Sequence, residues 1–456
     1  MTERVEQENK WVYIETYGCQ MNVADSEIIA AQMQLAGYQL TDQIDEADAV
    51  LINTCSVRDN AEQRIIRRLD NLNGQRRRSG HPQIVGVLGC MAERVQETLI
   101  QDHGVDLVAG PDAYTDLPHL IAAAEAGEPA ISIELSKSET YSDVIPVRLP
   151  GLHISGFVSI MRGCNNFCTY CIVPFTRGRQ KSRDAGAILD ECRALIDNGA
   201  KEITLLGQNV NSYGLDKHAS GDTSFARLLR QVSELPGLAR LRFVTPHPKD
   251  LSPEVIAMFG EVPNLCPRLH LPLQAGSDRV LARMNRKYDM ARYMTLVEGL
   301  RAARPDIALS TDLIVGFPGE TEEQFQETLD AVRAVNFMSS FSFCYSDRPG
   351  TAASRHTDKV EPAEKLRRLE RLQALQEDLS SDWLKARVGC ETDILLEGAS
   401  RKQDGEDAAT ESWQGRDPWG DAVNVSLPAG IGKPGLIVPV AIVTAKKHSL
   451  IGELRG

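Results

Sequence analysis

Three cysteines occupy the same place in three successive strand–helix units, and this repetition constrains the fold more than any other feature of the sequence. Cys19, Cys55 and Cys90, spaced by 36 and 35 residues, each follow a short apolar run that leads into a segment of helical periodicity. The alternation predicts an open parallel sheet with helices on both faces, whose loops converge at the carboxyl edge. We therefore expect the three thiols to meet in space. The expected strands are residues 11–16, 49–54 and 84–89, and the expected helices are residues 25–36, 61–78 and 92–101.

A second group of cysteines is compact. Cys164, Cys168 and Cys171 form a C-x3-C-x2-C pattern directly after an expected strand. Soft thiolates suit iron–sulfur clusters, and three ligands for the four irons of a [4Fe–4S] cluster leave one iron open. Zinc sites normally show paired C-x2-C spacings, so the pattern favours the cluster over zinc. The remaining cysteines are interpreted as small buried side chains: Cys192, Cys266, Cys344 and Cys390.

Length and composition exclude several classes of protein. A chain of 456 residues suggests about three domains. No apolar run approaches the ~18 residues of a membrane span, and the polar N-terminus is unlike a signal peptide. We therefore expect a cytoplasmic protein without membrane contact, in which cysteines stay reduced. The net charge of −13 argues against indiscriminate binding of nucleic acid.

Two local runs reverse this charge balance. Residues 162–183 contain five basic residues and no acidic one, and residues 58–78 contain seven arginines against three acidic residues. Each run is either a solvated face or a grip on phosphates. Because both adjoin expected cysteine loops, the second interpretation places them on the two sides of one nucleic-acid channel.

A second alternation of strands and helices fills the middle of the chain and predicts a full or partial (β/α) barrel, with its chemistry at the carboxyl ends of the strands. The polar residues 113–155 are interpreted as the connection into it. Leucines at positions 366, 369, 372, 375 and 379 indicate a packing stripe of a helix. After Trp383, short strands separated by glycines and prolines predict a small antiparallel barrel. The expected strands of both parts are residues 157–161, 202–206, 241–244, 268–271, 308–315, 339–343, 392–396, 422–425 and 436–443.

The residues around both cysteine groups resemble the radical S-adenosylmethionine methylthiotransferases. Gly163–Pro174 is similar to that family's cluster loop. Three other segments resemble the N-terminal three-cysteine domain of the family: Tyr17–Glu27, Asn53–Arg58 and Gly89–Met91. Five further segments resemble the tRNA-modifying branch of the family, called MiaB: Leu205–Tyr213, His247–Asp250, His270–Ser277, Asn285–Tyr288 and Gly316–Glu320. Glu397–Ser400 and His448–Gly452 resemble a TRAM domain. The sequence departs from the family pattern at two places. Gln180 stands where the family often has an acidic residue, and Asp417–Gly420 replaces a more usual polar run. Both places concern RNA contacts and not metal ligands.

The resemblance implies three domains: an N-terminal methylthiotransferase domain (residues 10–125), a radical S-adenosylmethionine barrel (150–380) and a TRAM-like β-barrel (383–450). It implies two [4Fe–4S] clusters. One, on Cys164, Cys168 and Cys171, would bind S-adenosylmethionine as the radical source. The other, on Cys19, Cys55 and Cys90, would hold or supply sulfur, and a second S-adenosylmethionine would give the methyl group.

The implied substrate is tRNA carrying N(6)-dimethylallyladenosine next to the anticodon, to which a methylthio group is added. A flavodoxin- or ferredoxin-like electron donor is also implied, whereas the sulfur source is not. Gly207, Gln208 and Asn209, which follow an expected barrel strand, are candidates for contacting S-adenosylmethionine; a tight turn with a cap explains them equally well. Two alternatives stay open: the same chemistry on a ribosomal protein side chain or another modified adenosine, and a non-catalytic iron–sulfur RNA-binding protein.

Overall fold

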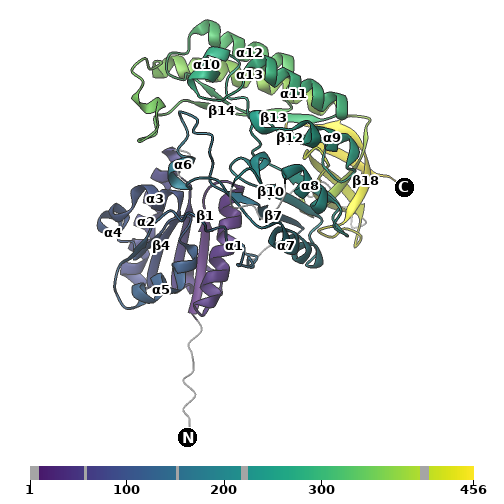
Figure 1. Cartoon of the computed structure of the whole chain (residues 1–456). Helices are drawn as coiled ribbons and strands as arrows, with labels where there is room; N and C mark the ends of the chain where they lie inside the picture. Colours follow the sequence, from purple (N-terminus) through teal and green to yellow (C-terminus); the bar gives the residue numbers. More distant parts are fainter. Residues whose placement is uncertain (1–9, 56–58, 150–153, 217–223, 401–409, 456) are drawn as a thin grey trace.

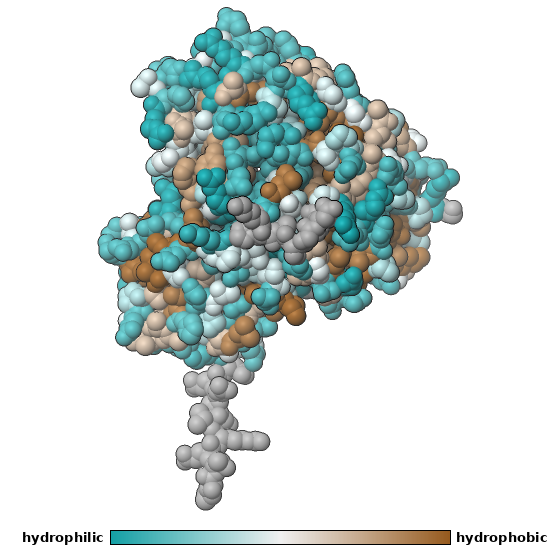
Figure 2. All heavy atoms as spheres, viewed as in Figure 1, coloured by the Kyte–Doolittle hydropathy of each residue, from teal (hydrophilic) through white to brown (hydrophobic). Residues whose placement is uncertain are grey.

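The computed structural model describes residues 10–55, 59–149, 154–216, 224–400 and 410–455. Its N-terminal part (purple to blue) packs against a central part (teal to green), which a small C-terminal barrel (yellow) joins on the other side (Figure 1). Hydrophilic and hydrophobic side chains are mixed on the face shown in Figure 2. None of the helices within these ranges combines the length and the apolar character that crossing a membrane requires. Arg58, which belongs to the first basic run, lies outside the described residues.

The N-terminal part is an open sheet of parallel strands in the order β2-β1-β3-β4-β5-β6. Helices α1 and α5 cover one face, and α2, α3 and α4 cover the other, which explains why every residue of β3 and β4 is buried. The predicted open parallel sheet is confirmed. Its strands are β1 (Lys10–Thr16), β2 (Tyr38–Leu40), β3 (Ala49–Thr54), β4 (Ile84–Gly89), β5 (Leu107–Ala109) and β6 (Ala130–Ser132); its helices are α1 (Gln20–Leu35), α2 (Asp59–Ser79), α3 (Cys90–Val95), α4 (Glu97–His103) and α5 (Leu117–Glu125).

Two local predictions for this part are wrong. The single helix expected at 92–101 is divided into α3 and α4, because Gln96 between them has a φ of 52°. Neither glycine nor proline marks this break in the sequence. Residues 113–155 do more than connect: they contain α5 and the strand β6, so the sheet extends to Ser132.

Six parallel strands of the central part form an open barrel in two halves. Strands β11, β10 and β7 pair in one sheet, and β12, β13 and β14 pair in the other. An isolated parallel bridge links Leu241 of β11 to Leu265, just before β12, so the expected (β/α) barrel exists in its partial form. The strands are β7 (Ser155–Ser159), β10 (Glu202–Leu206), β11 (Arg240–Phe243), β12 (Arg268–His270), β13 (Ala308–Val315) and β14 (Ser339–Cys344). A short hairpin, β8 (Met161–Arg162) with β9 (Lys181–Ser182), encloses the cysteine loop and α6 (Val173–Thr176).

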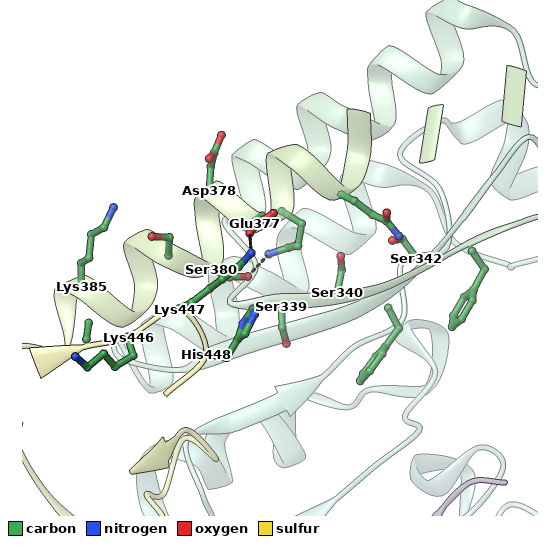
Figure 3. Close-up of a pocket in the computed structure, with 16 residues that line it drawn as sticks. Ser339, Ser340, Ser342, Glu377, Asp378, Ser380, Lys385, Lys446, Lys447 and His448 are labelled. Carbon is green, nitrogen blue, oxygen red and sulfur yellow. Dashed lines mark hydrogen bonds and ion pairs between the residues drawn. The ribbon is translucent and has the colours of Figure 1, made fainter. Parts of the chain in front are cut away.

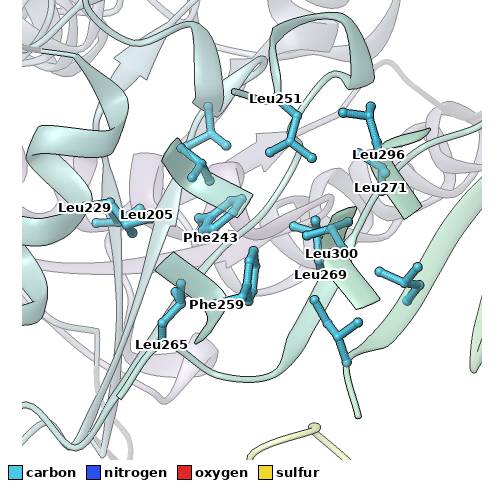
Figure 4. Packing of buried hydrophobic residues seen from close by; sticks show 14 of the residues in the cluster. Leu205, Leu229, Phe243, Leu251, Phe259, Leu265, Leu269, Leu271, Leu296 and Leu300 are labelled. Carbon is cyan, nitrogen blue, oxygen red and sulfur yellow. The ribbon is translucent and has the colours of Figure 1, made fainter. Parts of the chain in front are cut away.

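Helices cover the outer faces of these strands. Leucine and phenylalanine side chains from the strands pack there with those of the helices, as Figure 4 shows for Leu205, Phe243, Phe259, Leu269 and Leu300. Since side chains alternate along a strand, the residues between these ones face the barrel interior, which we call the lumen. The helices are α7 (Ala185–Asp197), α8 (Phe225–Ser233), α9 (Pro253–Glu261), α10 (Asp278–Arg283), α11 (Met290–Ala303) and α12 (Glu322–Val335).

The N-terminal part meets the central barrel on its lumen side. Met21 and Ala24, in the first turns of α1, are buried with Leu206 at the end of β10 and pack against Phe157 of β7. Phe157 and Leu206 alternate with Val158 and Leu205, which belong to the helix-covered core. The start of α1 therefore lies at the mouth of the lumen, near the carboxyl ends of β7 and β10.

A long helix, α13 (Pro362–Ala386), leads into a closed five-stranded barrel. Leu372 is fully buried and its neighbours Leu369, Leu375 and Leu379 pack against the central core, as predicted, whereas Leu366 is exposed. The C-terminal barrel is not wholly antiparallel as expected, because β17 and β19 pair in parallel. Its strands are β15 (Glu391–Ala399), β16 (Thr410–Arg416), β17 (Ala422–Pro428), β18 (Ile437–Ala445) and β19 (Leu450–Leu454).

Three arginines at the amino ends of the central strands hold the C-terminal barrel in place. Arg240 donates to the carbonyl oxygens of Asp393 and Arg416 at 2.8 and 2.7 Å. Arg242 and Arg268 donate to the carbonyls of Asp417 and Trp419 at 3.3 and 3.2 Å. The C-terminal barrel thus covers the amino end of the lumen, and the carboxyl end, where chemistry is expected, faces the N-terminal part.

Candidate functional site

The N-terminal cysteines (Cys19, Cys55 and Cys90) lie together at the carboxyl edge of the six-stranded sheet, as predicted. Cys19 caps α1, Cys55 follows β3, and Cys90 begins α3. The Cys19 and Cys55 thiols are hydrogen-bonded to each other. This bond, helped by Arg177, outweighs burial and lowers the pKa of Cys19 to about 6. In this setting a cysteine is available as a thiolate near neutral pH.

Two glycines allow this close approach. Gly18 has a φ of 148°, and a Cβ there would lie 2.8 Å from Cβ of Cys55. Gly89 has a φ of 89°, and a Cβ there would lie 2.6 Å from the carbonyl oxygen of Thr54. Both contacts are shorter than real Cβ atoms show, so only glycine lets Cys19 and Cys90 sit beside the end of β3.

The loop cysteines (Cys164, Cys168 and Cys171) lie at the carboxyl end of the central barrel. Burial raises the pKa of Cys164, and burial together with the neighbouring Cys168 raises the pKa of Cys171 to about 12. Cys168 accepts a hydrogen bond from Nη1 of the buried Arg286 at 3.4 Å. In addition to burial, Cys168 raises the pKa of Cys164, and Cys168 and Cys164 both raise the pKa of Cys171, so the three thiols lie near one another, as the spacing predicted.

The chemistry of each group fits a [4Fe–4S] cluster. Each group offers three thiols and one arginine N–H directed at a sulfur atom, a donor set typical of iron–sulfur sites. Within the described ranges, no three cysteine, histidine or carboxylate side chains lie close enough to share one metal ion. A cubane differs from such a site, because each of its thiolate ligands binds a separate iron.

Arg177 and Arg286 are the arginines that direct an N–H at these groups, and sequence reasoning missed both. Arg177 appeared only as part of a basic run, although it lies six residues after Cys171. Its Nε donates to Sγ of Cys90 at 3.2 Å. Arg286 lies within a segment that carried the family resemblance, and it also donates to the carbonyl of Pro272 at 3.1 Å.

Gly207, Gln208 and Asn209 lie directly after β10, at the carboxyl end of the barrel as expected. Nδ2 of Asn209 donates to Asp250 at 2.8 Å. In the part of the chain that the structure describes, Oε1 of Gln208 and Oδ1 of Asn209 are buried without a hydrogen-bond donor. Two unused acceptors at this end of the barrel are suited to a ligand that carries an amino or hydroxyl group.

His247, from the next loop, adds an unused donor to the same end of the barrel. Its Nδ1 accepts from the backbone N–H of Lys249 at 3.2 Å, which places the proton of the neutral ring on Nε2. Burial and the nearby Arg286 lower the pKa of His247 to about 2, so the ring stays neutral. Nε2 is buried and has no partner among the described residues.

The lumen also contains an exposed aromatic side chain. Phe341 of β14 is 54% exposed, and its ring centroid lies 6.0 Å from that of His270 on β12. His270 contacts Ser310 at 3.1 Å and Asp312 at 3.4 Å, both on the lumen face of β13. A flat apolar face beside polar groups is suited to stacking a nucleobase.

A groove of about 980 Å³ continues from Phe341 along the edge of β14, between α13 and the turn that joins β18 to β19 (Figure 3). The turn supplies the exposed side chains Lys446, Lys447 and His448. Lys447 reaches α13 and pairs with Glu377 at 2.5 Å. Aromatic and basic residues in one groove are typical of surfaces that bind single-stranded nucleic acid.

The basic runs do not form the channel that the sequence predicted. In the second run, the ion pairs of Arg162, Arg177, Lys181 and Arg183 are buried, and only Arg179 is exposed. In the first run, Arg76 pairs with Asp106 at the amino edge of the sheet. Since α2 spans ~30 Å, Arg76 lies far from the cysteine end of the sheet. The prediction of two runs flanking one channel is wrong.

Comparisons with known proteins agree with this architecture. The family model described as "Uncharacterized protein family UPF0004" matches residues 11–110, and that of the Radical SAM superfamily matches residues 158–332. A relative named tRNA-2-methylthio-N(6)-dimethylallyladenosine synthase, from Nitratidesulfovibrio vulgaris strain Hildenborough, is 53% identical over 447 residues, which cover 97% of this chain and 98% of the relative. A relative of the same name from Bacteroides fragilis is 54% identical over 396 residues, with 87% and 86% covered.

A solved structure shares the fold at low sequence identity. It is the radical S-adenosylmethionine methyltransferase TsrM from Kitasatospora setae, with cobalamin and a [4Fe–4S] cluster bound. The TM-score is 0.56 and the identity 13%, over 76% of this chain and 74% of that one.

Proposed function

The chain belongs to the tRNA-2-methylthio-N(6)-dimethylallyladenosine synthase family, and from this premise we propose that it adds a methylthio group to N(6)-dimethylallyladenosine in tRNA. We assign two [4Fe–4S] clusters to it, one on Cys19, Cys55 and Cys90 and one on the loop cysteines. When bound, these clusters supply the reductive cleavage of S-adenosylmethionine and the sulfur chemistry that a purine C–H requires. A flavodoxin- or ferredoxin-like protein is the proposed reductant.

The short path between the two cysteine groups is the observation that carries this proposal. Arg177 contacts Cys90, and Arg177 is only the sixth residue after Cys171, so these positions lie at most ~21 Å apart along the chain. The N-terminal cysteines also adjoin α1, which packs at the mouth of the lumen. One substrate base held in the lumen would therefore be near both groups.

The residues of the lumen and groove suit the proposed substrate. Phe341 offers an apolar face to the adenine ring or to its dimethylallyl substituent, and His270 and Asp312 offer polar contacts beside it. Gln208, Asn209 and His247 offer two acceptors and one donor to S-adenosylmethionine. Lys446 and Lys447 lie where the phosphates of an RNA strand in the groove would pass.

Product analysis tests the proposal. The reconstituted protein is incubated anaerobically with S-adenosylmethionine, a reductant and tRNA that carries N(6)-dimethylallyladenosine, and the tRNA is then digested to nucleosides. Mass spectrometry should detect 2-methylthio-N(6)-dimethylallyladenosine. Release of 5′-deoxyadenosine with unchanged tRNA, while a ribosomal protein or another adenosine becomes methylthiolated, would assign the chain a different substrate.

Phe341→Ala tests the lumen assignment. It should lower turnover of the dimethylallylated tRNA at least tenfold and leave the uncoupled cleavage of S-adenosylmethionine unchanged. Leu366→Ala is the matched control, because it removes an equally exposed apolar side chain on the outside of the barrel. Equal effects of both variants would remove Phe341 from the site.

A further inference from the structure

Arg177 belongs to the central part of the chain but is buried against the N-terminal part. Its side chain is 4% exposed, and Nη2 donates to Oδ2 of Asp25 on α1 at 2.7 Å. Nε donates to Sγ of Cys90 at 3.2 Å. Two of its three nitrogen atoms thus contact the N-terminal part, one at a carboxylate and the other at a cysteine sulfur.

The third nitrogen, Nη1, has no acceptor. It is buried, and within the described ranges no hydrogen-bond partner is within reach. A buried guanidinium N–H without an acceptor is costly, and such groups are rare in folded proteins. Against the effect of burial, the charges of groups that include Asp25, Cys90 and Cys19 raise the pKa of the Arg177 guanidinium, so the unused N–H belongs to a group that adjoins the N-terminal cysteines.

Arg162 shares the carboxylate of Asp25 with Arg177 but, among the described residues, makes no hydrogen bond to sulfur; it also pairs with Asp112 at 3.5 Å. It donates to the other oxygen of Asp25 at 2.7 Å and to the carbonyl of Pro111 at 2.6 Å. Its side chain is 1% exposed. Asp25 therefore holds two buried arginines from the central part, of which Arg177 is the one that reaches a cysteine.

We propose that Arg177 completes the N-terminal cluster site from the neighbouring domain, donating through Nε to Cys90 and through Nη1 to a sulfide of the [4Fe–4S] cluster. The inference rests on the cluster assignment of the proposed function. It makes Arg177 a positioning residue that tunes the cluster, since N–H donors to cluster sulfur atoms set the reduction potential. Donation to sulfur stabilises the more negative, reduced state and raises that potential.

Because Arg177 comes from the other domain, cluster binding and cluster potential depend on different parts of the molecule. The N-terminal cysteines alone can bind the cluster. The cluster reaches its working potential only when the two domains are docked and Asp25 orients the guanidinium. The contact between domains is thereby part of the redox site.

The test uses the full chain in a Cys164→Ala/Cys168→Ala/Cys171→Ala background, in which only the N-terminal cluster forms. Arg177→Gln is introduced, and the midpoint potential is measured by a redox titration followed by electron paramagnetic resonance. We expect the iron content to be retained and the potential to fall by at least 59 mV, a tenfold change in the ratio of reduced to oxidised cluster for one electron. The resonance spectrum should change as well.

Two further variants separate tuning from packing. Arg162→Gln loses a contact with the same carboxylate but no contact with sulfur, so it should leave the potential and the spectrum unchanged. Arg177→Lys keeps the charge with fewer directed donors and should give an intermediate potential. If Arg177→Gln does not retain iron, Arg177→Lys takes its place in the comparison.

An unchanged potential in an iron-loaded Arg177 variant, or an equal shift in Arg162→Gln, would overturn the inference. If the background variant with native Arg177 binds no cluster at all, the cluster assignment itself fails. The two failures are therefore distinguishable before Arg177 is altered.

Discussion

Asp25 accepts a hydrogen bond of 2.7 Å from Arg162, and the two side chains, 137 residues apart in the sequence, are almost completely excluded from solvent. The same carboxylate accepts from Arg177 at 2.7 Å. The carboxylate and the two guanidiniums lie between the N-terminal sheet and the central barrel. This contact fixes how the two cysteine groups face each other.

Asp25→Asn should destabilise the protein strongly, by ~3–5 kcal/mol, because buried Arg177 loses its carboxylate partner and buried Arg162 keeps only the 3.5 Å pair with Asp112. Thermal unfolding of the full chain measures this. Asp190→Asn is the matched control: Asp190 pairs with Arg193 at 2.6 Å on the surface, where such pairs contribute ~1 kcal/mol or less. Equal shifts in the melting temperature would mean that the buried contact does not hold the domains together.

Replacing Cys19, Cys55 and Cys90 by alanine should halve the iron, from about eight to about four per chain if both clusters are cubanes. The variant should still convert S-adenosylmethionine to 5′-deoxyadenosine but form no methylthiolated tRNA, because the loop cysteines are intact. Iron analysis and nucleoside mass spectrometry measure the two effects. Methylthio-adenosine formed over several turnovers would make the N-terminal cluster structural.

Thiol reactivity of the iron-free chain should distinguish the two cysteine groups. With a pKa of about 6, Cys19 is mostly thiolate at pH 7, whereas Cys171, with a pKa of about 12, stays protonated. Iodoacetamide at pH 7 should therefore label Cys19 on the order of tenfold faster or more, as followed by peptide mass spectrometry. Cys55→Ala removes the hydrogen bond and should move the labelling of Cys19 to higher pH. Equal rates for Cys19 and Cys171 would contradict the expected difference.

Lys446→Ala combined with Lys447→Ala should weaken tRNA binding and reduce its salt slope by about one unit per lost phosphate contact. Arg77→Ala with Arg78→Ala is the control, because these exposed arginines lie at the far end of α2, and the slope should not change. Arg76 is left in place since it pairs with Asp106. A lower slope in the control alone would move the RNA surface to the N-terminal part.

Arg387→Ala should destabilise the C-terminal barrel by ~3–5 kcal/mol, because the fully buried Asp417 loses its partner at 2.9 Å. The guanidinium also lies 3.8 Å from the ring centroid of Trp419. Arg455→Ala, which breaks an exposed pair with Glu391, serves as the control for thermal unfolding.

Truncation at Trp383 would remove the carbonyl acceptors of Arg240, Arg242 and Arg268. We therefore expect it to destabilise the central barrel rather than to affect RNA binding alone.

The strands and the cysteine positions could be predicted because their signals are local. The apolar runs 49–54 and 84–89 became β3 and β4 with unchanged bounds, and Cys55 and Cys90 follow them directly. Equal spacing of the repeated units then sufficed to bring the thiols to one sheet edge.

The roles of the arginines could not be predicted, because their partners are distant in the sequence. Arg177 and Asp25 are separated by 152 residues, and Lys181 and Asp112 by 69. A run of basic residues has the same composition whether it faces solvent or a buried carboxylate. The position of Phe341 in the lumen could not be predicted either, because the alternation of side chains along a strand does not tell which face the helices cover.

The arginines beneath the central barrel bind their neighbour through backbone carbonyls of Asp393, Arg416, Asp417 and Trp419. A carbonyl is presented by every amino acid, so these four contacts recognise the path of the backbone and not its side chains. The side chains of the turn Asp417–Gly420 are less free, because Asp417 pairs with Arg387 at 2.9 Å and Trp419 donates to the carbonyl of Asp306 at 2.7 Å. Gly420 is restricted as well, because its φ of 83° is one that residues with a side chain rarely adopt. The unusual Asp417–Gly420 sequence is thus compatible with an intact joint between the two barrels.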